Sequence, residues 1–267
     1  MTTARILIIA GSDSGGGAGI QADIKTVTLL GGHAMTAITA LTAQNTLGVS
    51  AVHPVPAEMV IAQIDAVADD IGVDAVKIGM IGNAAIAERV ADRLDRPDLA
   101  GVPLVFDPVM IATSGSRLAD AATIAAFGRL MRRAAVSTPN LDELGTLSGG
   151  RALGDEPAVA AAAAGLIAQG SGPILATGGG FATGELTDLL FTAGGDAPER
   201  RWTAGWIDTI HDHGTGCTLA SAIATGLGQG LALADAITRA RAFVRAALLA
   251  APGLGRGHGP MGHRSID

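Results

Sequence analysis

The chain has 267 residues, of which 48% are hydrophobic and 16% charged, so we expect a large core and little disorder. A formal net charge of −7 argues against nucleic-acid binding, which usually requires a basic face. The single cysteine allows no internal disulfide and is typical of a reducing compartment. The longest apolar stretch, residues 158–168, is shorter than the ~20 residues that span a bilayer. These features predict a soluble cytoplasmic protein with no membrane or nucleic-acid partner.

The N-terminal segment predicts a strand, a glycine-rich loop and a helix. Residues 5–10 are a continuous aliphatic run, typical of a strand that is buried on both faces. Residues 11–19 contain five glycines, and residues 20–30 follow with a helical pattern. The loop matches neither G-x-G-x-x-G nor the P-loop, because Ile24 stands where a P-loop requires glycine. A wall of a substrate pocket and a plain flexible turn both remain open.

A second apolar run, over residues 35–43, predicts a strand that ends at Gln44. Ligands of open α/β sheets bind outside the carboxyl ends of the strands. The Gln44 amide carries a donor and an acceptor, which suits it to the edge of a heterocycle. A turn residue that satisfies local backbone groups is the simpler alternative.

The middle of the chain alternates helices and strands. Helices are predicted over residues 57–70, 84–94, 119–134 and 156–169, and strands over residues 73–78, 103–106 and 173–177. In the first of these helices the expected apolar stripe comprises Met59, Ile61, Ile64, Val67 and Ile71.

Two segments in this region carry candidate metal or phosphate ligands. Asp107 follows the strand at residues 103–106 and precedes a proline, so it could contact a metal ion or its water shell. Pro139 indicates the start of a short helix. Asn140 and Glu143 are three residues apart and share one face of that helix. They could reach one metal-bound phosphate, or they could simply cap a surface helix.

The C-terminal third contains the most distinctive stretch, residues 211–218. It precedes an alanine-rich helix, and a glycine-rich turn at a helix start directs unpaired N–H groups at one spot. Gly214, Thr215 and Gly216 are therefore a candidate anion site. A helix N-terminus also lowers a thiol pKa, which makes Cys217 a candidate base or nucleophile. A small buried filler is the alternative for this cysteine.

The remaining elements complete one predicted fold. Residues 185–191 and 200–206 look like an antiparallel edge hairpin with its turn at residues 194–197, and residues 232–249 form a second long helix. No repeat or long linker divides the chain. The pattern predicts one α/β domain over residues 1–267, with a mostly parallel central sheet covered by helices on both faces.

Seven segments together resemble the bacterial hydroxymethylpyrimidine/phosphomethylpyrimidine kinases of thiamine biosynthesis, within the ribokinase-like superfamily. They are AGSDSGGGAGIQAD (10–23), TAQNT (42–46), KIGM (77–80), DPVM (107–110), TPNLDE (138–143), HGTGCT (213–218) and GHGP (257–260). Each is weak alone, but their order and spacing are specific across nearly the whole chain. The resemblance implies a three-layer ribokinase-like sandwich and a homodimer. It also implies ATP- and Mg²⁺-dependent phosphorylation of 4-amino-5-hydroxymethyl-2-methylpyrimidine and then of its monophosphate.

The resemblance assigns roles by motif. Gln44 would read the pyrimidine edge, in a pocket lined by Gly11, Asp23, Met80 and Val109. Mg²⁺ would be organised by Asp107 and Glu143, and ATP would be bound by Asn140, Thr177 and Gly178. The anion hole would consist of Gly214, Thr215 and Gly216, with Cys217 nearest the attacking hydroxyl.

Two segments depart from the family pattern. Residues 177–180 read TGGG where the family often has KGGH, which removes a positive charge near the nucleotide. Residues 211–213 read HDH where the family often has NTH. Because Asp212 would repel a phosphate, we expect its side chain to face solvent.

Four alternatives remain open at this point. A pyridoxal-type kinase shares the fold and also phosphorylates a hydroxymethyl heterocycle. A cysteine hydrolase would pair Cys217 with His213 or His211, and a zinc site would combine the same three residues without the usual paired spacing. A non-catalytic pyrimidine-binding protein is the fourth.

Overall fold

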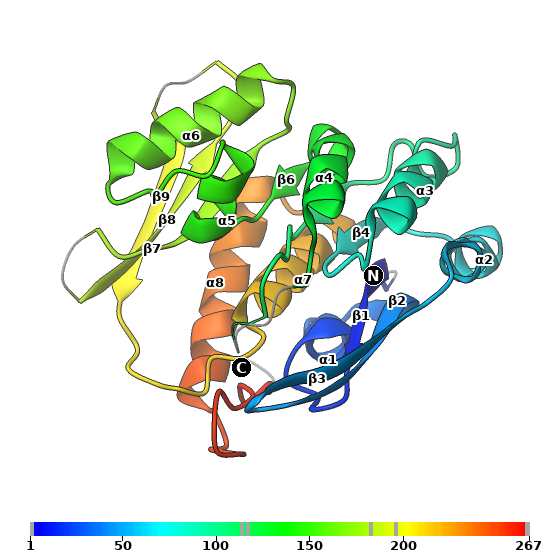
Figure 1. Ribbon diagram of the computed structural model, residues 1–267, viewed down its shortest axis with the longest axis horizontal. Helices are drawn as coiled ribbons and strands as arrows, with labels where there is room; N and C mark the ends of the chain where they lie inside the picture. Colours follow the sequence, from blue (N-terminus) through cyan, green and yellow to red (C-terminus); the bar gives the residue numbers. More distant parts are fainter. Residues whose placement is uncertain (1–2, 113–114, 116–117, 182–183, 195–196, 265–267) are drawn as a thin grey trace.

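A computed structural model of the chain describes residues 3–112, 115, 118–181, 184–194 and 197–264. The strands in this part are β1 (Arg5–Asp13), β2 (His33–Asn45), β3 (Gly48–Pro54), β4 (Ala75–Ile78), β5 (Leu104–Phe106), β6 (Val136–Ser137), β7 (Ile174–Gly179), β8 (Glu185–Phe191) and β9 (Arg200–Gly205). They form one sheet in the order β3-β2-β1-β4-β5-β6-β7-β8-β9 (Figure 1).

The strand directions match the predicted mixed sheet. All neighbours from β2 through β7 are parallel. The predicted antiparallel hairpin of β8 and β9 forms one edge. The opposite edge is β3, which pairs antiparallel with β2 and was not predicted. Part of the predicted hairpin turn at residues 194–197 lies outside the described residues.

The helices cover both faces of this sheet, as predicted. They are α1 (Gly19–Leu29), α2 (Ala57–Asp70), α3 (Ala84–Leu94), α4 (Ala121–Arg133), α5 (Leu141–Leu147), α6 (Glu156–Ala168), α7 (Thr215–Gly228) and α8 (Leu233–Leu249). One core joins the sheet to α2, α3, α4, α5 and α6, and the other joins it to α1, α7 and α8 (Figure 1). No helix within the described residues is long and apolar enough to cross a membrane.

Alternation along the strands builds these two cores. Leu7 and Ile9 of β1 face the first core, and Ile6 and Ile8 face the second. Successive side chains of a strand point to opposite faces, so a strand that is apolar at every position must be covered on both sides. The continuous run in the sequence therefore indicated the layered fold correctly.

The predicted stripe on α2 was wrong in part. The structure buries Val60 and Ile64 but leaves Met59 and Ile71 exposed. The helix is rotated relative to the predicted stripe, so Val60 rather than Met59 meets the sheet.

Two glycines bring α7 close to its neighbours. A Cβ atom at Gly226 would lie 2.7 Å from Ala236 Cβ of α8, and one at Gly228 would lie 2.7 Å from Ile6 Cδ1 of β1. Real Cβ contacts are not this short, because closely packed interiors leave no room for an added methyl group. The C-terminal end of α7 is therefore fixed against both the sheet and α8.

A buried ion pair connects the sheet to the second helical layer. Lys77 Nζ of β4 lies 2.9 Å from both carboxylate oxygens of Asp23 on α1, and Ser221 Oγ of α7 donates to Asp23 over 2.6 Å. Both charged side chains are fully buried. Burial alone would lower the pKa of Lys77, but the charge of Asp23 raises it above its usual range. The lysine therefore remains a cation inside the protein.

Replacing Lys77 with methionine should lower the free energy of unfolding by about 3–5 kcal/mol, because the Asp23 carboxylate would stay buried without its cation. Urea denaturation measures this loss. The double variant Lys77→Met/Asp23→Leu is the control and should regain most of it, because an apolar pair often replaces a buried ion pair at little cost. A single variant as stable as the parent would contradict the assignment.

Candidate active site

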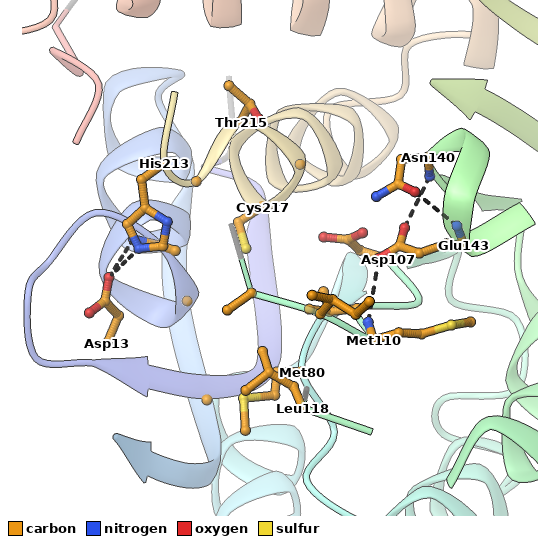
Figure 2. A pocket seen from close by; sticks show the side chains of 18 of the residues that line it. Asp13, Met80, Asp107, Met110, Leu118, Asn140, Glu143, His213, Thr215 and Cys217 are labelled. Atoms are coloured by element: carbon orange, nitrogen blue, oxygen red, sulfur yellow. Dashed lines mark hydrogen bonds and ion pairs between the residues drawn. The ribbon is translucent and has the colours of Figure 1, made fainter. Parts of the chain in front are cut away.

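Residues at the carboxyl edge of the sheet line one cavity of about 390 Å³ (Figure 2). The predicted site residues that line it are Gly11, Gln44, Met80, Asp107, Val109, Asn140, Glu143, Thr177, Gly214, Thr215, Gly216 and Cys217. They are far apart in the sequence and come together because the parallel strands end at the same edge.

The glycine turn before α7 has the conformation that an anion site requires. Gly214 has φ +89°, and a Cβ atom there would lie 2.0 Å from Gly17 O, so only glycine fits. The first intrahelical hydrogen bond runs from Thr218 N–H to Gly214 O over 2.9 Å. The N–H groups of Gly216 and Cys217 precede it, and no side chain caps the helix. These donors and the positive end of the helix are available to an anion.

A buried carboxylate lies beside this turn. Asp107 follows β5, and a Cβ atom at Gly216 would lie 3.6 Å from Asp107 Oδ2. That oxygen is buried and has no hydrogen-bond partner. Burial raises the pKa of Asp107 well above its usual value, the charge of Lys77 lowers it, and that of Asp23 raises it. An unpaired buried carboxylate oxygen is costly, so its presence indicates a ligand position.

Asn140 and Glu143 form a capping box at the start of α5. The Asn140 side chain accepts from Glu143 N–H over 2.9 Å, and Asn140 N–H donates to Glu143 Oε2 over 3.0 Å. The alternative that the two residues cap a helix is thus confirmed, with Asn140 exposed at the helix start. Glu143 is buried beside Asp107 (Figure 2). Burial and the charge of Asp107 both raise its pKa.

The prediction that the helix N-terminus lowers the pKa of Cys217 was wrong for the free protein. Burial raises the pKa of the Cys217 thiol to about 12; the charge of Lys77 lowers it, while those of Asp23 and Asp107 raise it. Burial and the two carboxylates outweigh the lowering by Lys77 and by the Gly19 backbone hydrogen bond. Cys217 is therefore a neutral thiol at physiological pH.

The glycine-rich loop after β1 binds its own carboxylate. Asp13 accepts hydrogen bonds from the N–H groups of Gly15, Gly17 and Ala18 over 2.8–3.0 Å. Converging N–H groups of this kind otherwise bind phosphates. Because Asp13 already occupies them, this loop is a wall of the cavity rather than a second phosphate site.

Gln44 lies at an irregular point of β2. The register with β3 shifts between Ala43 and Gln44, and such bulges re-aim a side chain. The Gln44 amide lies 3.1 Å from His213 Nε2, which in turn lies 3.0 Å from Asp13 Oδ2. His213 thus interacts with Asp13 and Gln44 through Nε2.

The prediction that Asp23 lines the pyrimidine pocket was wrong. Its side chain is completely buried in the ion pair with Lys77 and is absent from the cavity wall. The charge of a carboxylate on a helix that faces the sheet has to be neutralised inside the core. Asp23 therefore contributes to the site indirectly, through its ion pair with Lys77 in the core.

A second cavity, of about 290 Å³, adjoins the first. The two share Asn140, Thr177, Thr215 and Gly216, and Gly178 lines the second alone. Sequence analysis missed its cations, Arg241 and Arg245 of α8. Arg241 Nε donates to buried Asp188 over 2.7 Å, and this contact fixes the guanidinium at the cavity wall.

Comparisons with known proteins identify the family. The family model described as phosphomethylpyrimidine kinase matches residues 13–262. The chain belongs to the phosphomethylpyrimidine kinase family. A hydroxymethylpyrimidine/phosphomethylpyrimidine kinase of Rhizobium meliloti is 48% identical over 98% of this chain and 97% of its own length.

Two further comparisons place the family in context. A thiamine biosynthesis bifunctional protein ThiED of Geobacter sulfurreducens is 45% identical over 97% of this chain and 52% of its own length. The structure of Bacillus subtilis pyridoxal kinase in an ADP complex superposes with a TM-score of 0.85 at 33% identity, over 98% of each chain. The fold is thus shared by kinases named for two different heterocycles.

The structure also addresses the departures from the kinase family pattern. Asp212 is partly exposed, and His258 Nδ1 lies 2.8 Å from its carboxylate, but Asp212 also lines the second cavity, so the prediction that it faces only solvent was wrong in part. Within the described residues, no group of three His, Cys, Asp or Glu side chains could hold a metal ion. His211, His213 and Cys217 therefore do not form the zinc site considered above.

Because a pKa near 12 leaves few thiolates, alkylation of native Cys217 by iodoacetamide at pH 8 should be about a thousandfold slower than that of an ordinary cysteine. The rate should rise about tenfold per pH unit up to pH 10, and mass spectrometry measures it on the chain's single cysteine. The urea-unfolded chain is the control and should react at the ordinary rate. A native rate that reaches a plateau below pH 9 would contradict the raised pKa.

Proposed function

We propose that this chain is a single-domain kinase that transfers the γ-phosphoryl group of ATP to 4-amino-5-hydroxymethyl-2-methylpyrimidine and then to the monophosphate, for thiamine biosynthesis. One observation carries the proposal: two adjoining cavities share the glycine turn at the start of α7. A phosphoryl group has to pass between two substrates, and such a turn can hold it where they meet. The 48% identity to the Rhizobium meliloti kinase supports the choice of substrate.

The first cavity suits a small aromatic ring. Gln44 supplies a donor and an acceptor for its edge, while Met80 and Val109 supply apolar walls. A Cβ atom at Gly11 would lie 3.1 Å from Met80 Sδ, so the glycine lets the thioether lie against the loop. These residues bind and orient the pyrimidine with its hydroxymethyl group toward α7.

The second cavity suits the nucleotide. Thr177 and Gly178 lie at the end of β7, and Asn140 joins them from the start of α5. Arg245 brings a positive charge to this cavity, where the family often has a lysine in place of Thr177, whereas the charge of Arg241 is paired with Asp188. Arginine pairs well with phosphate oxygens because its planar group donates several hydrogen bonds.

The carboxylates fit a magnesium ion. Mg²⁺ in kinases is usually held by one or two carboxylates together with substrate phosphates and water. Asp107 Oδ2, buried and without a hydrogen-bond partner, is the atom that would hold it, while both oxygens of Glu143 accept from backbone N–H groups of Met110 and Asn140. When bound, the ion would neutralise phosphate charge. Glu143 would contribute to the negative charge that holds the ion.

The residues of this chain contribute position and charge stabilisation. The N–H groups of Gly216 and Cys217 would donate to the transferred phosphoryl oxygens as these accumulate charge. A loose phosphoryl-transfer transition state needs little help from a base early on. We therefore place the neutral Cys217 thiol against the attacking hydroxyl and assign it no proton abstraction.

The proposal predicts ATP consumption with hydroxymethylpyrimidine and with its monophosphate, at higher kcat/KM than with pyridoxal. ADP release measures all three reactions, and EDTA should abolish them until Mg²⁺ is restored. Because the fold is shared with a pyridoxal kinase, a preference for pyridoxal would establish that alternative activity instead. Pyrimidine binding without any ATP consumption would leave a non-catalytic binding protein.

The same assay separates a functional Asp107 from a structural one. Asp107→Asn should lower kcat by at least about 100-fold, the usual effect of removing one charge-stabilising group. Its stability should be equal or higher, because a buried unpaired charge has been removed. Asp70→Asn, at an exposed position on α2, is the control and should change neither property. If the variant loses stability as well as activity, the role of Asp107 is structural.

We also propose that the protein is a homodimer. The ribbon of β2 and β3 lies at the sheet edge, with Leu41 and Val52 exposed on its two faces. Exposed apolar side chains on an edge ribbon favour association, because the edge offers unpaired backbone groups as well.

Light scattering should therefore give twice the chain mass of 26.5 kDa. The variant Leu41→Lys/Val52→Lys should give the single mass with unchanged helix content. A parent protein of single mass at micromolar concentration would overturn the homodimer.

A further inference from the structure

Three side chains from separate parts of the sequence meet at one nitrogen atom on the wall of the first cavity. His213 Nε2 lies 3.0 Å from Asp13 Oδ2 and 3.1 Å from the Gln44 amide nitrogen. Figure 2 shows His213 and Asp13 directed toward one another. All three residues line the cavity, and the imidazole is buried. Whether this nitrogen carries a proton therefore determines which end of the Gln44 amide can face it.

The Asp13 carboxylate determines that protonation. Asp13 accepts hydrogen bonds from the N–H groups of Gly15, Gly17 and Ala18, and these bonds, which do not depend on His213, favour its ionised form. An ionised carboxylate only accepts hydrogen bonds. An unprotonated Nε2 would therefore set two acceptors 3.0 Å apart. His213 Nε2 must carry a proton and donate it to Asp13, whether the ring is neutral or charged.

That proton conflicts with an amide nitrogen facing the ring, because two donors would lie 3.1 Å apart. A second conflict occurs on the other side of the amide. Thr42 Oγ1 lies 2.9 Å from Ser12 O and 3.2 Å from Gln44 Oε1. The hydroxyl has one proton, and the carbonyl of Ser12 can only accept it. No proton is left between Thr42 and the amide oxygen.

Turning the Gln44 amide by 180° removes both conflicts. Its oxygen then shares the single Nε2–H proton of His213 with Asp13 in a bifurcated hydrogen bond, and its nitrogen donates to the free lone pair of Thr42 Oγ1. The two ends of an amide are nearly equal in size, so the hydrogen-bond partners decide the orientation. Every donor then faces an acceptor along the chain from Asp13 through His213, Gln44 and Thr42 to Ser12.

We propose that His213, itself held by Asp13, is a positioning residue that fixes the Gln44 amide with its oxygen toward the imidazole. This inference rests on the proposed function and deepens it, because the fixed amide offers its remaining N–H and its second lone pair in one set order. An aminopyrimidine edge presents a ring acceptor beside an exocyclic donor. The corresponding 4-oxo ring presents the reverse order and meets unmatched groups. His213 thereby sets which heterocycle the cavity accepts.

The first test needs no substrate. Long-range ¹H–¹⁵N NMR of the free protein should show His213 Nε2 protonated throughout the neutral pH range, with the signal assigned by its absence in His213→Gln. A His213 ring protonated only on Nδ1 would overturn the proposal. This result stands even if the protein turns over none of the proposed substrates, so the two proposals can fail separately.

The second test measures KM and kcat separately. His213→Phe keeps a ring but removes the donor, so KM for the aminopyrimidine should rise about tenfold, the usual effect of one lost hydrogen bond. KM for ATP should stay within about twofold, and discrimination against the 4-oxo analogue should fall. His213→Gln places an amide N–H near Nε2 and should restore KM to within about threefold of the parent. His33→Gln, exposed at the start of β2, is the matched control.

A double-mutant cycle distinguishes positioning from a merely structural role. In a Gln44→Ala background, His213→Phe should cause no further rise in KM, because His213 acts through Gln44. Additive losses, or an equal loss for pyrimidine and ATP, would overturn the proposal. If His213→Phe does not fold, His213→Gln and His213→Asn are compared instead. The asparagine side chain cannot reach as far, so His213→Gln should restore KM and His213→Asn should not.

Discussion

The site depends on one buried positive charge. Lys77 is enclosed between the sheet and the second helical layer, where it neutralises Asp23 and lowers the pKa of both Asp107 and Cys217. Through Asp23 and Ser221 it also connects β4, α1 and α7, the elements that place the glycine turn. An isolated carboxylate so deep in the protein would take up a proton. The cation therefore maintains the negative charge of the site and the position of its anion-binding turn.

Two glycine-rich turns in this chain look alike in the sequence and act differently. The turn after β1 directs its N–H groups at Asp13, a residue of the same loop. The turn before α7 has no side-chain cap, so its donors remain available. The first turn is therefore a preformed wall because Asp13 occupies its donors, whereas the second turn is an open anion site. The wall needs no ligand to hold its shape, and it fixes Gly17 against Gly214.

The layered fold could be predicted because continuous apolar runs need cover on both faces. The edge strand β3 could not, since most of its side chains are exposed and leave no burial pattern. Family motifs located the cavity wall, but Asp23 carries the same motif evidence as Gln44 and lies outside it. Sequence does not show which acidic residue meets a buried lysine. The pKa of Cys217 was mispredicted for a related reason: the helix start is visible in sequence, but the burial of the thiol and its neighbouring carboxylates are not.

The glycines at the far end of α7 give this helix a mechanical role. Gly228 lies against Ile6, and Gly226 lies against Ala236, while the anion-binding turn is at the other end of the same 14-residue helix, about 20 Å away. A helix this short moves as a rigid rod. A side chain added at Gly228 would have to displace the Ile6 side chain or move this end of α7, and with it the turn near Asp107. A substitution at Gly228, a position that contacts no ligand, can therefore alter phosphoryl transfer by moving the anion-binding turn.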